Sequence, residues 1–192
     1  MRGTLFLILG PSGSGKGVTI AHLKKTFPEA VFPISCTTRQ PRPGESDGAV
    51  YHFVSKMEFE RRKEAGDFLE WAVVHHDNMY GTLKAPIMEA LEAGKIVIRE
   101  VDMQGVISIQ KVLPRENVVS IFLTVATWDS LKMRIVRRHN ESDEELAKRE
   151  VSFKKEMEFS KSCDYVIENR DGEMEETFSK VDEIIRGRMV KT

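Results

Sequence analysis

The chain has 192 residues, of which 41% are hydrophobic and 31% charged, and its formal net charge at pH 7 is -1. A chain of this length can bury a core of its own as one domain. The nearly neutral charge argues against nucleic acid as a partner, and no apolar run is long enough for a membrane span or a signal peptide. We therefore expect a cytoplasmic globular protein with no nucleic-acid, membrane or obligate protein partner.

Short apolar runs alternate with amphipathic segments along the chain. Buried strands are expected at residues 4–9, 95–101, 118–125 and 165–168. Helices are expected at about residues 16–25, 56–65 and 143–162, with a further helix starting near residue 127. Strands that alternate with helices predict an α/β fold in which helices flank a parallel sheet.

Two helix starts carry a capping pattern. Ser55 stands three positions before Glu58, and Ser142 stands three positions before Glu145. In this pattern each side chain can satisfy a free backbone amide of the first turn. Helices are therefore expected to begin directly after Ser55 and Ser142.

The pattern changes in the segment between Ser35 and Lys95. It holds a turn-rich stretch at 40–48, short strands near 51–54 and 67–74, and a turn at Tyr80–Gly81. The segment predicts a small lobe inserted into the main sheet.

The strongest motif lies between the first strand and the first helix, and it reads G-P-S-G-S-G-K-G. Glycines let backbone amides turn toward phosphate oxygens, the helix N-terminus adds partial positive charge, and the lysine adds an ammonium group. This is the P-loop pattern, which predicts binding of a nucleoside triphosphate, here ATP. The residues assigned to ATP are Gly10, Pro11, Ser12, Gly13, Ser14, Gly15, Lys16 and Gly17.

One position departs from the general P-loop pattern. After Lys16, where a Ser or Thr hydroxyl usually meets Mg²⁺, the chain has Gly17 and then Val18. We therefore expect no direct protein ligand for Mg²⁺. The phosphates and water would hold the ion, with Glu100 and Asp102, at the end of a buried strand, as outer partners through water.

Several further motifs together resemble the guanylate kinase family. They are S-C-T-T-R-Q-P-R-P-G-E from Ser35, G-D-F-L-E-W-A from Gly66, Y-G-T from Tyr80, V-D-M-Q-G from Val101 and C-D-Y-V-I-E-N from Cys163. The resemblance spans nearly the whole chain. It implies one domain with a P-loop NTPase-type parallel sheet core at about 1–34, 96–126 and 163–192, a GMP-binding lobe at about 35–95 and a helical lid at about 127–162.

The resemblance also implies how GMP is held. The residues that it assigns to the GMP phosphate are Arg39, Arg42, Tyr51 and Tyr80. Two guanidinium groups and two phenols suit a dianion, because they offer several donors to its oxygens. On pattern alone, Arg39 and Arg42 could instead be solvated loop side chains.

For the guanine base, the resemblance assigns Glu70, supported by Ser35, Thr82 and Asp102. A carboxylate can accept hydrogen bonds from the adjacent N1–H and N2–H₂ groups of guanine, which adenine lacks. On pattern alone, Glu70 could equally be the solvent-facing residue of an alternating strand.

In the lid, the resemblance assigns closure on the triphosphate, and thus a catalytic role beside Lys16, to Arg134, Arg138 and Arg149. Three places depart from the family pattern: Arg137 to Asn140 replaces a glycine-rich turn, Arg99 replaces an apolar residue, and the loop from His75 to Met79 is longer. The paired histidines His75 and His76 are interpreted as part of a polar loop, since no further metal ligand has suitable spacing.

The implied activity is transfer of the γ-phosphoryl group of ATP to GMP, giving ADP and GDP in purine nucleotide metabolism. Two alternatives are a non-catalytic guanylate-kinase-like module that binds a protein partner, and a related P-loop kinase for another small molecule. The intact phosphate loop disfavours the first alternative, and the guanine-reading set around Glu70 disfavours the second.

Overall fold

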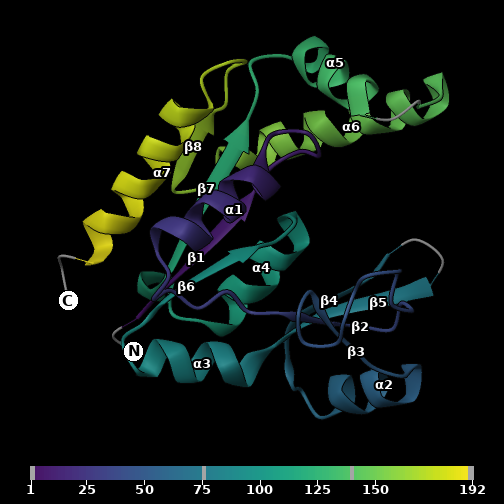
Figure 1. Cartoon of the computed structure of the whole chain (residues 1–192), viewed down its shortest axis with the longest axis vertical. Helices are drawn as coiled ribbons and strands as arrows, with labels where there is room; N and C mark the ends of the chain where they lie inside the picture. The colour runs from purple at the N-terminus through teal and green to yellow at the C-terminus, as the bar shows by residue number, and fades with distance from the viewer. Residues whose placement is uncertain (1–2, 75–76, 139–140, 190–192) are drawn as a thin grey trace.

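A parallel four-stranded sheet forms the centre of the molecule (Figure 1). The computed structural model describes residues 3–74, 77–138 and 141–189. The strand order is β6-β1-β7-β8. The strands are β1 (Thr4–Leu9), β6 (Ile96–Glu100), β7 (Val118–Thr124) and β8 (Tyr165–Glu168), and all pair in parallel. The four expected strands and the α/β class are therefore confirmed, but β8 lies at the edge of the sheet and only Ile167 in it is buried, so the prediction of a buried strand there is wrong.

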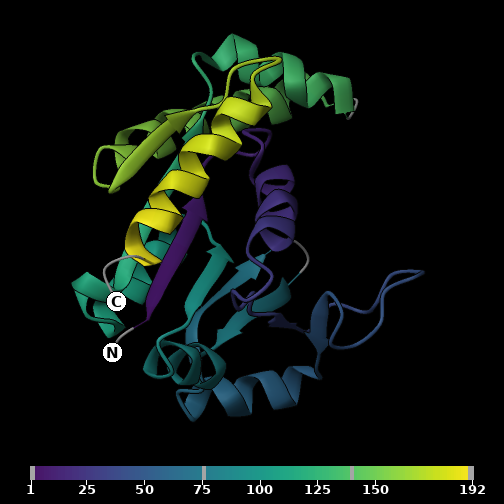
Figure 2. The ribbon, with the colours of Figure 1, turned by 60° about the vertical axis from the view of Figure 1, so that its left-hand side comes forward.

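Helices cover both faces of this sheet. Successive residues of β1 point to opposite faces, so they pack against different helices. Leu5 and Leu7 pack with residues of α3 (Lys84–Glu92) and α4 (Met103–Val112). Phe6 and Ile8 pack with residues of α1 (Lys16–Thr26) and α7 (Met174–Met189). Figure 2 shows α7 and α1 running alongside β1. Burial on both faces explains why the two inner strands, β1 and β7, show no alternation of apolar and polar residues.

A second four-stranded sheet, with the order β3-β2-β5-β4, forms a smaller lobe. Its strands are β2 (Ser35–Thr37), β3 (Tyr51–Phe53), β4 (Phe68–Val74) and β5 (Asn78–Leu83). The helix α2 (Lys56–Glu64) lies on this sheet through Phe59, which packs with Cys36, Phe68 and Met79. The lobe therefore has an apolar core separate from those of the parallel sheet.

The expected turn at Tyr80–Gly81 is wrong, because both residues lie inside β5. Gly81 pairs with Cys36 on one side and with Trp71 on the other. A Cβ atom at Gly81 would lie only 2.8 Å from a ring carbon of Phe68 and 3.0 Å from the ring of Phe59. The glycine thus marks a close approach of two aromatic rings to a strand.

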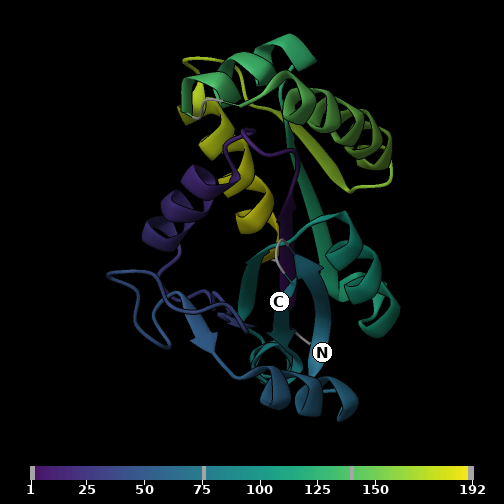
Figure 3. The same ribbon diagram turned by 90° about the vertical axis from the view of Figure 1, so that its right-hand side faces the viewer.

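The helices α5 (Trp128–Arg138) and α6 (Asp143–Ser160) pack together at the end of the molecule opposite α2 (Figure 3). Their shared core contains Leu131, Ile135, Leu146 and Phe153. The two predicted caps are present, since Ser55 Oγ accepts a hydrogen bond from Glu58 N at 3.1 Å and Ser142 Oγ accepts one from Glu145 N at 3.3 Å. Among the described residues, none of the helices has the length and apolar character that a membrane span needs.

Candidate active site

The phosphate loop connects β1 to α1, as the sequence predicted. Gly10, Gly13 and Gly15 have φ angles of 138°, 95° and 102°, a region that side chains other than glycine rarely adopt. A Cβ atom at Gly10 would lie 2.0 Å from the carbonyl oxygen of Leu123 in β7. The loop can therefore take this path only with glycines, and it ends at the N-terminus of α1, where free amides favour an anion.

Lys16, in the first turn of α1, bends back over this loop. Its Nζ atom donates hydrogen bonds to the carbonyl oxygens of Gly10 at 2.7 Å and Pro11 at 3.1 Å, and lies 3.9 Å from Glu100 Oε1. Burial lowers the pKa of Lys16, while the charges of Glu100 and Glu156 raise it. The ammonium group is thus partly desolvated, which strengthens its attraction to a phosphate.

A cleft of about 790 Å³ runs from the phosphate loop to the second sheet. Gly10, Ser12 and Lys16 line it on the side of the phosphate loop. Side chains of the second sheet and of the end of β6 line it elsewhere, namely Ser35, Tyr51, Glu70, Tyr80, Arg99, Glu100 and Asp102. The cleft therefore joins residues assigned to ATP with residues assigned to GMP.

Glu70 on β4 faces this cleft, with 14% of its side chain exposed. One carboxylate oxygen accepts a short hydrogen bond from the Thr82 hydroxyl on the paired strand β5. Burial raises the pKa of Glu70, whereas the hydrogen bond from Thr82 and the positive charge of Arg99 lower it. Between the two interpretations of the sequence, the structure therefore excludes a solvent-facing strand position for Glu70.

Asp102 lies directly before α4, where its side chain both caps the helix and faces the cleft. Its Oδ1 atom accepts a hydrogen bond from Gly105 N at 2.7 Å and so caps the helix. It also lines the cleft beside Glu100. The cap fixes the orientation of a carboxylate group at the carboxyl end of β6.

The residues assigned to the GMP phosphate are only partly brought together. The rings of Tyr51 and Tyr80 both line the cleft, and their centroids are 5.6 Å apart. Arg39 instead forms an ion pair with Glu45 at 2.9 Å, and its guanidinium group lies 5.4 Å from the centre of the Tyr51 ring. Arg42 is exposed, and neither arginine lines the cleft.

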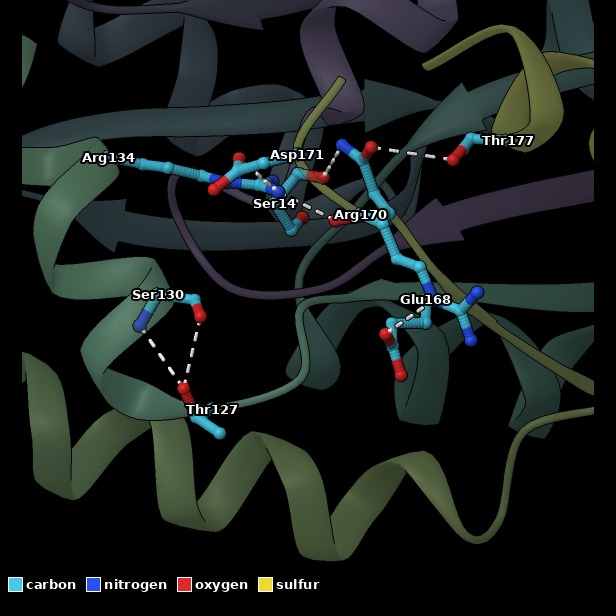
Figure 4. A network of polar contacts seen from close by, with 9 residues as sticks. Ser14, Thr127, Ser130, Arg134, Glu168, Arg170, Asp171 and Thr177 are labelled. Carbon is cyan, nitrogen blue, oxygen red and sulfur yellow. Dashed lines mark hydrogen bonds and ion pairs between the residues drawn. The ribbon is translucent and has the colours of Figure 1, made fainter. Parts of the chain in front are cut away.

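The arginines that the resemblance assigns to a lid also lie away from the cleft. Arg134 donates to Asp171 Oδ1 at 2.9 Å and to the carbonyl oxygen of Asn169 at 2.7 Å (Figure 4). Arg149 forms an ion pair with Glu141 at 2.8 Å. The side chain of Arg138 and residues 139–140 of the unusual lid turn lie outside the described residues. The structure therefore does not bring Arg134 or Arg149 to Lys16.

Sequence reasoning missed Asn169, which directly follows β8. Its Nδ2 atom donates to the carbonyl oxygen of Ser14 at 2.8 Å, and its Oδ1 atom accepts from the Thr177 hydroxyl at 3.4 Å. Ser14, Arg134 and Thr177 are all part of the polar network drawn in Figure 4. A polar residue at the carboxyl end of a predicted parallel strand was the available signal, since such ends meet at one edge of the sheet.

Glu156 on α6 was also missed, and it lines the cleft. Burial raises its pKa, and the charge of Lys16 lowers it. No sequence pattern distinguished Glu156, because it lies in a helix with many charged residues. Only the packing of α6 places it near Lys16.

The Guanylate kinase family model matches residues 2–188 of the chain. The chain belongs to the guanylate kinase family. Among its curated relatives is a guanylate kinase of Helicobacter pylori, 43% identical over 167 residues, which are 87% of this chain and 80% of the relative. A guanylate kinase of Thermotoga maritima is 37% identical over 191 residues, covering 100% of this chain and 90% of the relative.

The fold agrees with this family. The crystal structure of guanylate kinase from Anaplasma phagocytophilum matches with a TM-score of 0.74 at 27% identity, covering 97% of this chain and 86% of that chain. The predicted P-loop NTPase-type sheet core and the resemblance stated above are thereby confirmed.

In this member of the guanylate kinase family, the position directly after Lys16 offers no hydroxyl to a metal ion. Gly17 has no side chain, and Thr19 Oγ1 donates to the carbonyl oxygen of Gly15 at 3.1 Å within the helix. Across residues 3–74, 77–138 and 141–189, no three His, Cys, Asp or Glu side chains form a metal site. His75 and His76 lie outside the described residues. The carboxylates of Glu100 and Asp102 line the cleft and suit a hydrated Mg²⁺, which prefers oxygen ligands.

Removing the Asn169 amide should loosen the phosphate loop. We expect Asn169→Ala to lower the free energy of unfolding by about 1–3 kcal/mol, because it leaves the buried Ser14 carbonyl without this partner. Urea unfolding checks the value. Arg170→Ala is the matched control, since Arg170 is an exposed neighbour that pairs with Glu168, and equal stability of the two variants would contradict the assignment.

Proposed function

We propose that the cleft holds the two substrates of the guanylate kinase reaction, with ATP on the phosphate loop and GMP against the second sheet. The chain is a nucleoside monophosphate kinase that phosphorylates GMP using ATP, as its membership of the family and its curated relatives indicate. One observation carries the placement of the substrates: Lys16 and the buried Glu70 line the same cleft.

GMP would be recognised at both ends. The Glu70 carboxylate would accept the N1–H and N2–H₂ donors of guanine, next to Ser35, Thr82 and Asp102. Tyr51, Tyr80, Arg39 and Arg42 would bind its phosphate. Because Arg39 is engaged by Glu45 here, phosphate binding requires it to exchange or share that carboxylate, and the neighbouring rings of Tyr51 and Phe53 keep the guanidinium group close.

ATP would lie on Gly10 to Gly17, whose amides and helix N-terminus suit its β- and γ-phosphates. Lys16 would exchange the carbonyl oxygens of Gly10 and Pro11 for phosphate oxygens. Glu100 and Asp102 would hold Mg²⁺ through water. Bound there, the ion would neutralise negative charge on the phosphates.

The chemistry needs no nucleophilic side chain, because a GMP phosphate oxygen is already anionic near neutral pH. Catalysis would come from aligning the two phosphates and from the positive charges of Lys16, Arg134, Arg138 and Arg149 on the transferring group. Since Arg134 and Arg149 are paired away from the cleft, they must release Asp171 and Glu141 before transfer.

Two parts of the chain would move to close the site. Residues 35–95 would act as the GMP-binding lobe, with α3 attaching it to the main core through Ile87 and Leu91, and residues 127–162 would act as the lid. Closure would expel water, which otherwise competes with GMP as the acceptor. We place this enzyme in the cytoplasm, where its nucleotide substrates are.

A coupled assay of ADP release from ATP tests the proposal. With Mg²⁺ present, GMP should stimulate release, and AMP, CMP and UMP should not. Release that is equal with all four nucleotides, or absent although GMP binds, would contradict the proposed function and favour a binding module.

A further inference from the structure

Arg99 is a largely buried arginine near the carboxyl end of β6, a strand that is apolar up to that position. It lies on β6 after the buried residues Val97 and Ile98 and pairs with Leu7 of β1. Only 16% of its side chain is exposed, and it lines the cleft. Charged side chains are seldom buried without a partner, because desolvation is costly. Interactions around Arg99 must therefore offset the free energy that its desolvation costs.

The Arg99 guanidinium group connects two sides of the base site. Its Nη1 atom donates to the carbonyl oxygen of Pro33 at 3.0 Å, and its Nη2 atom donates a short hydrogen bond to Ser35 Oγ. The same Nη2 atom lies 3.9 Å from Glu70 Oε1. Both hydrogen bonds go to neutral oxygen atoms. The positive charge of the group is thus compensated through space by Glu70.

The positive charge of Arg99 affects the pKa of Glu70, as do the other groups around this carboxylate. Burial and the negative charge of Asp102 both raise the pKa of Glu70, while Arg99 and the Thr82 hydroxyl lower it. Around Arg99 itself, burial lowers the pKa of the guanidinium group, while the negative charges of Glu70 and Glu100 act in the opposite direction. A protonated Glu70 would present a hydrogen toward the donors of guanine and lose an acceptor.

We propose that Arg99 is a positioning residue for guanine recognition, which holds Ser35 beside Glu70 and maintains the Glu70 side chain as a carboxylate inside the cleft. This inference rests on the proposed function, because it assigns Glu70 to the base. It adds a residue from the main sheet to a set drawn largely from the inserted lobe.

The test is the pH dependence of GMP binding, measured by calorimetry without ATP from about pH 4.5, near the ordinary pKa of a Glu carboxyl, to about pH 8. Arg99→Met and Arg99→Gln both remove the charge, and the Gln side chain keeps a donor in case Met impairs folding. Each should weaken binding increasingly as the pH falls. A rise of one unit in the pKa of Glu70 weakens binding about tenfold at pH values below both pKa values.

The ionisation of the GMP phosphate affects all variants alike, so it cancels when each variant is compared with the parent. Arg99→Lys keeps the charge and should retain the pH profile of the parent, with binding weakened by a similar factor at every pH. Arg61→Met is the matched control, because Arg61 is an exposed arginine on α2 that pairs with Glu58. Adding Glu70→Gln to Arg99→Gln should remove the extra pH dependence.

The results separate this inference from the function on which it rests. A parent that binds GMP, with neutral variants whose profiles run parallel to it, would overturn the role of Arg99 and leave the proposed function standing. A parent that does not bind GMP would overturn both. A steeper profile that persists after Glu70→Gln would also contradict the inference, since another group would then be titrating.

Discussion

Replacing Lys16 with Met should lower kcat for GMP phosphorylation by about a thousandfold, the loss typical of removing a charge or donor that stabilises a transition state. Lys16 is placed for this role by its hydrogen bonds to the Gly10 and Pro11 carbonyl oxygens, which hold the ammonium group over the phosphate loop. Steady-state kinetics with saturating ATP and GMP give the value. GMP binding should change little, since Lys16 lies on the ATP side of the cleft.

The same substitution should not destabilise the fold. Burial lowers the pKa of Lys16, so the folded state disfavours its charged form at neutral pH relative to the unfolded chain. Thermal unfolding of Lys16→Met should therefore show a Tm equal to or above that of the parent. Lys25→Met is the control, because Lys25 is an exposed lysine in the last turn of the same helix. A kcat close to that of the parent would remove Lys16 from the mechanism.

Replacing Glu70 with Gln should lower kcat/KM for GMP by about a hundredfold or more, the scale of discrimination that a buried hydrogen-bonding site achieves. The Gln side chain has nearly the same size, but its NH₂ group would face the N1–H and N2–H₂ donors of guanine. The KM for ATP should stay within about twofold of the parent value, since Glu70 is on the lobe side of the cleft.

Initial rates with GMP varied at fixed ATP, and then with ATP varied at fixed GMP, separate the two effects of Glu70→Gln. The control is Glu64→Gln, at an exposed carboxylate on α2. Equal losses toward ATP and GMP would show that Glu70 supports the cleft as a whole and does not read the base.

The central sheet was predictable because strands buried on both faces must be apolar throughout, and few other segments of this chain are. β1 begins and ends where the pattern placed it, and so does β8, although β8 is an edge strand in which only Ile167 is buried. The strands of the smaller lobe were harder to predict from the sequence. β5 contains Gly81, which suggests a turn locally, and only its packing against Phe68 and Phe59 shows why a glycine stands in a strand.

The candidate site was predictable where a local motif fixes the geometry, as in the loop from Gly10 to Lys16. Residues that reach the site only through tertiary packing could not be predicted from the sequence. Arg99 could be recognised as unusual in a strand, but its approach to Glu70 depends on how the two sheets are joined. For Arg134, the sequence motif carries an assignment for the closed enzyme, whereas the structure pairs the side chain with Asp171.

The helix α6 carries both Arg149, for which we propose a role in the lid, and Glu156, whose carboxylate lines the cleft. Arg149 and Glu156 are almost two full turns apart, so they lie on the same face, about 10 Å from each other. A rigid tilt of α6 that swings Arg149 toward the nucleotide must therefore displace Glu156 and change the electric field at Lys16. The pKa of Lys16 would then depend on the position of the lid, because the charge of Glu156 raises that pKa.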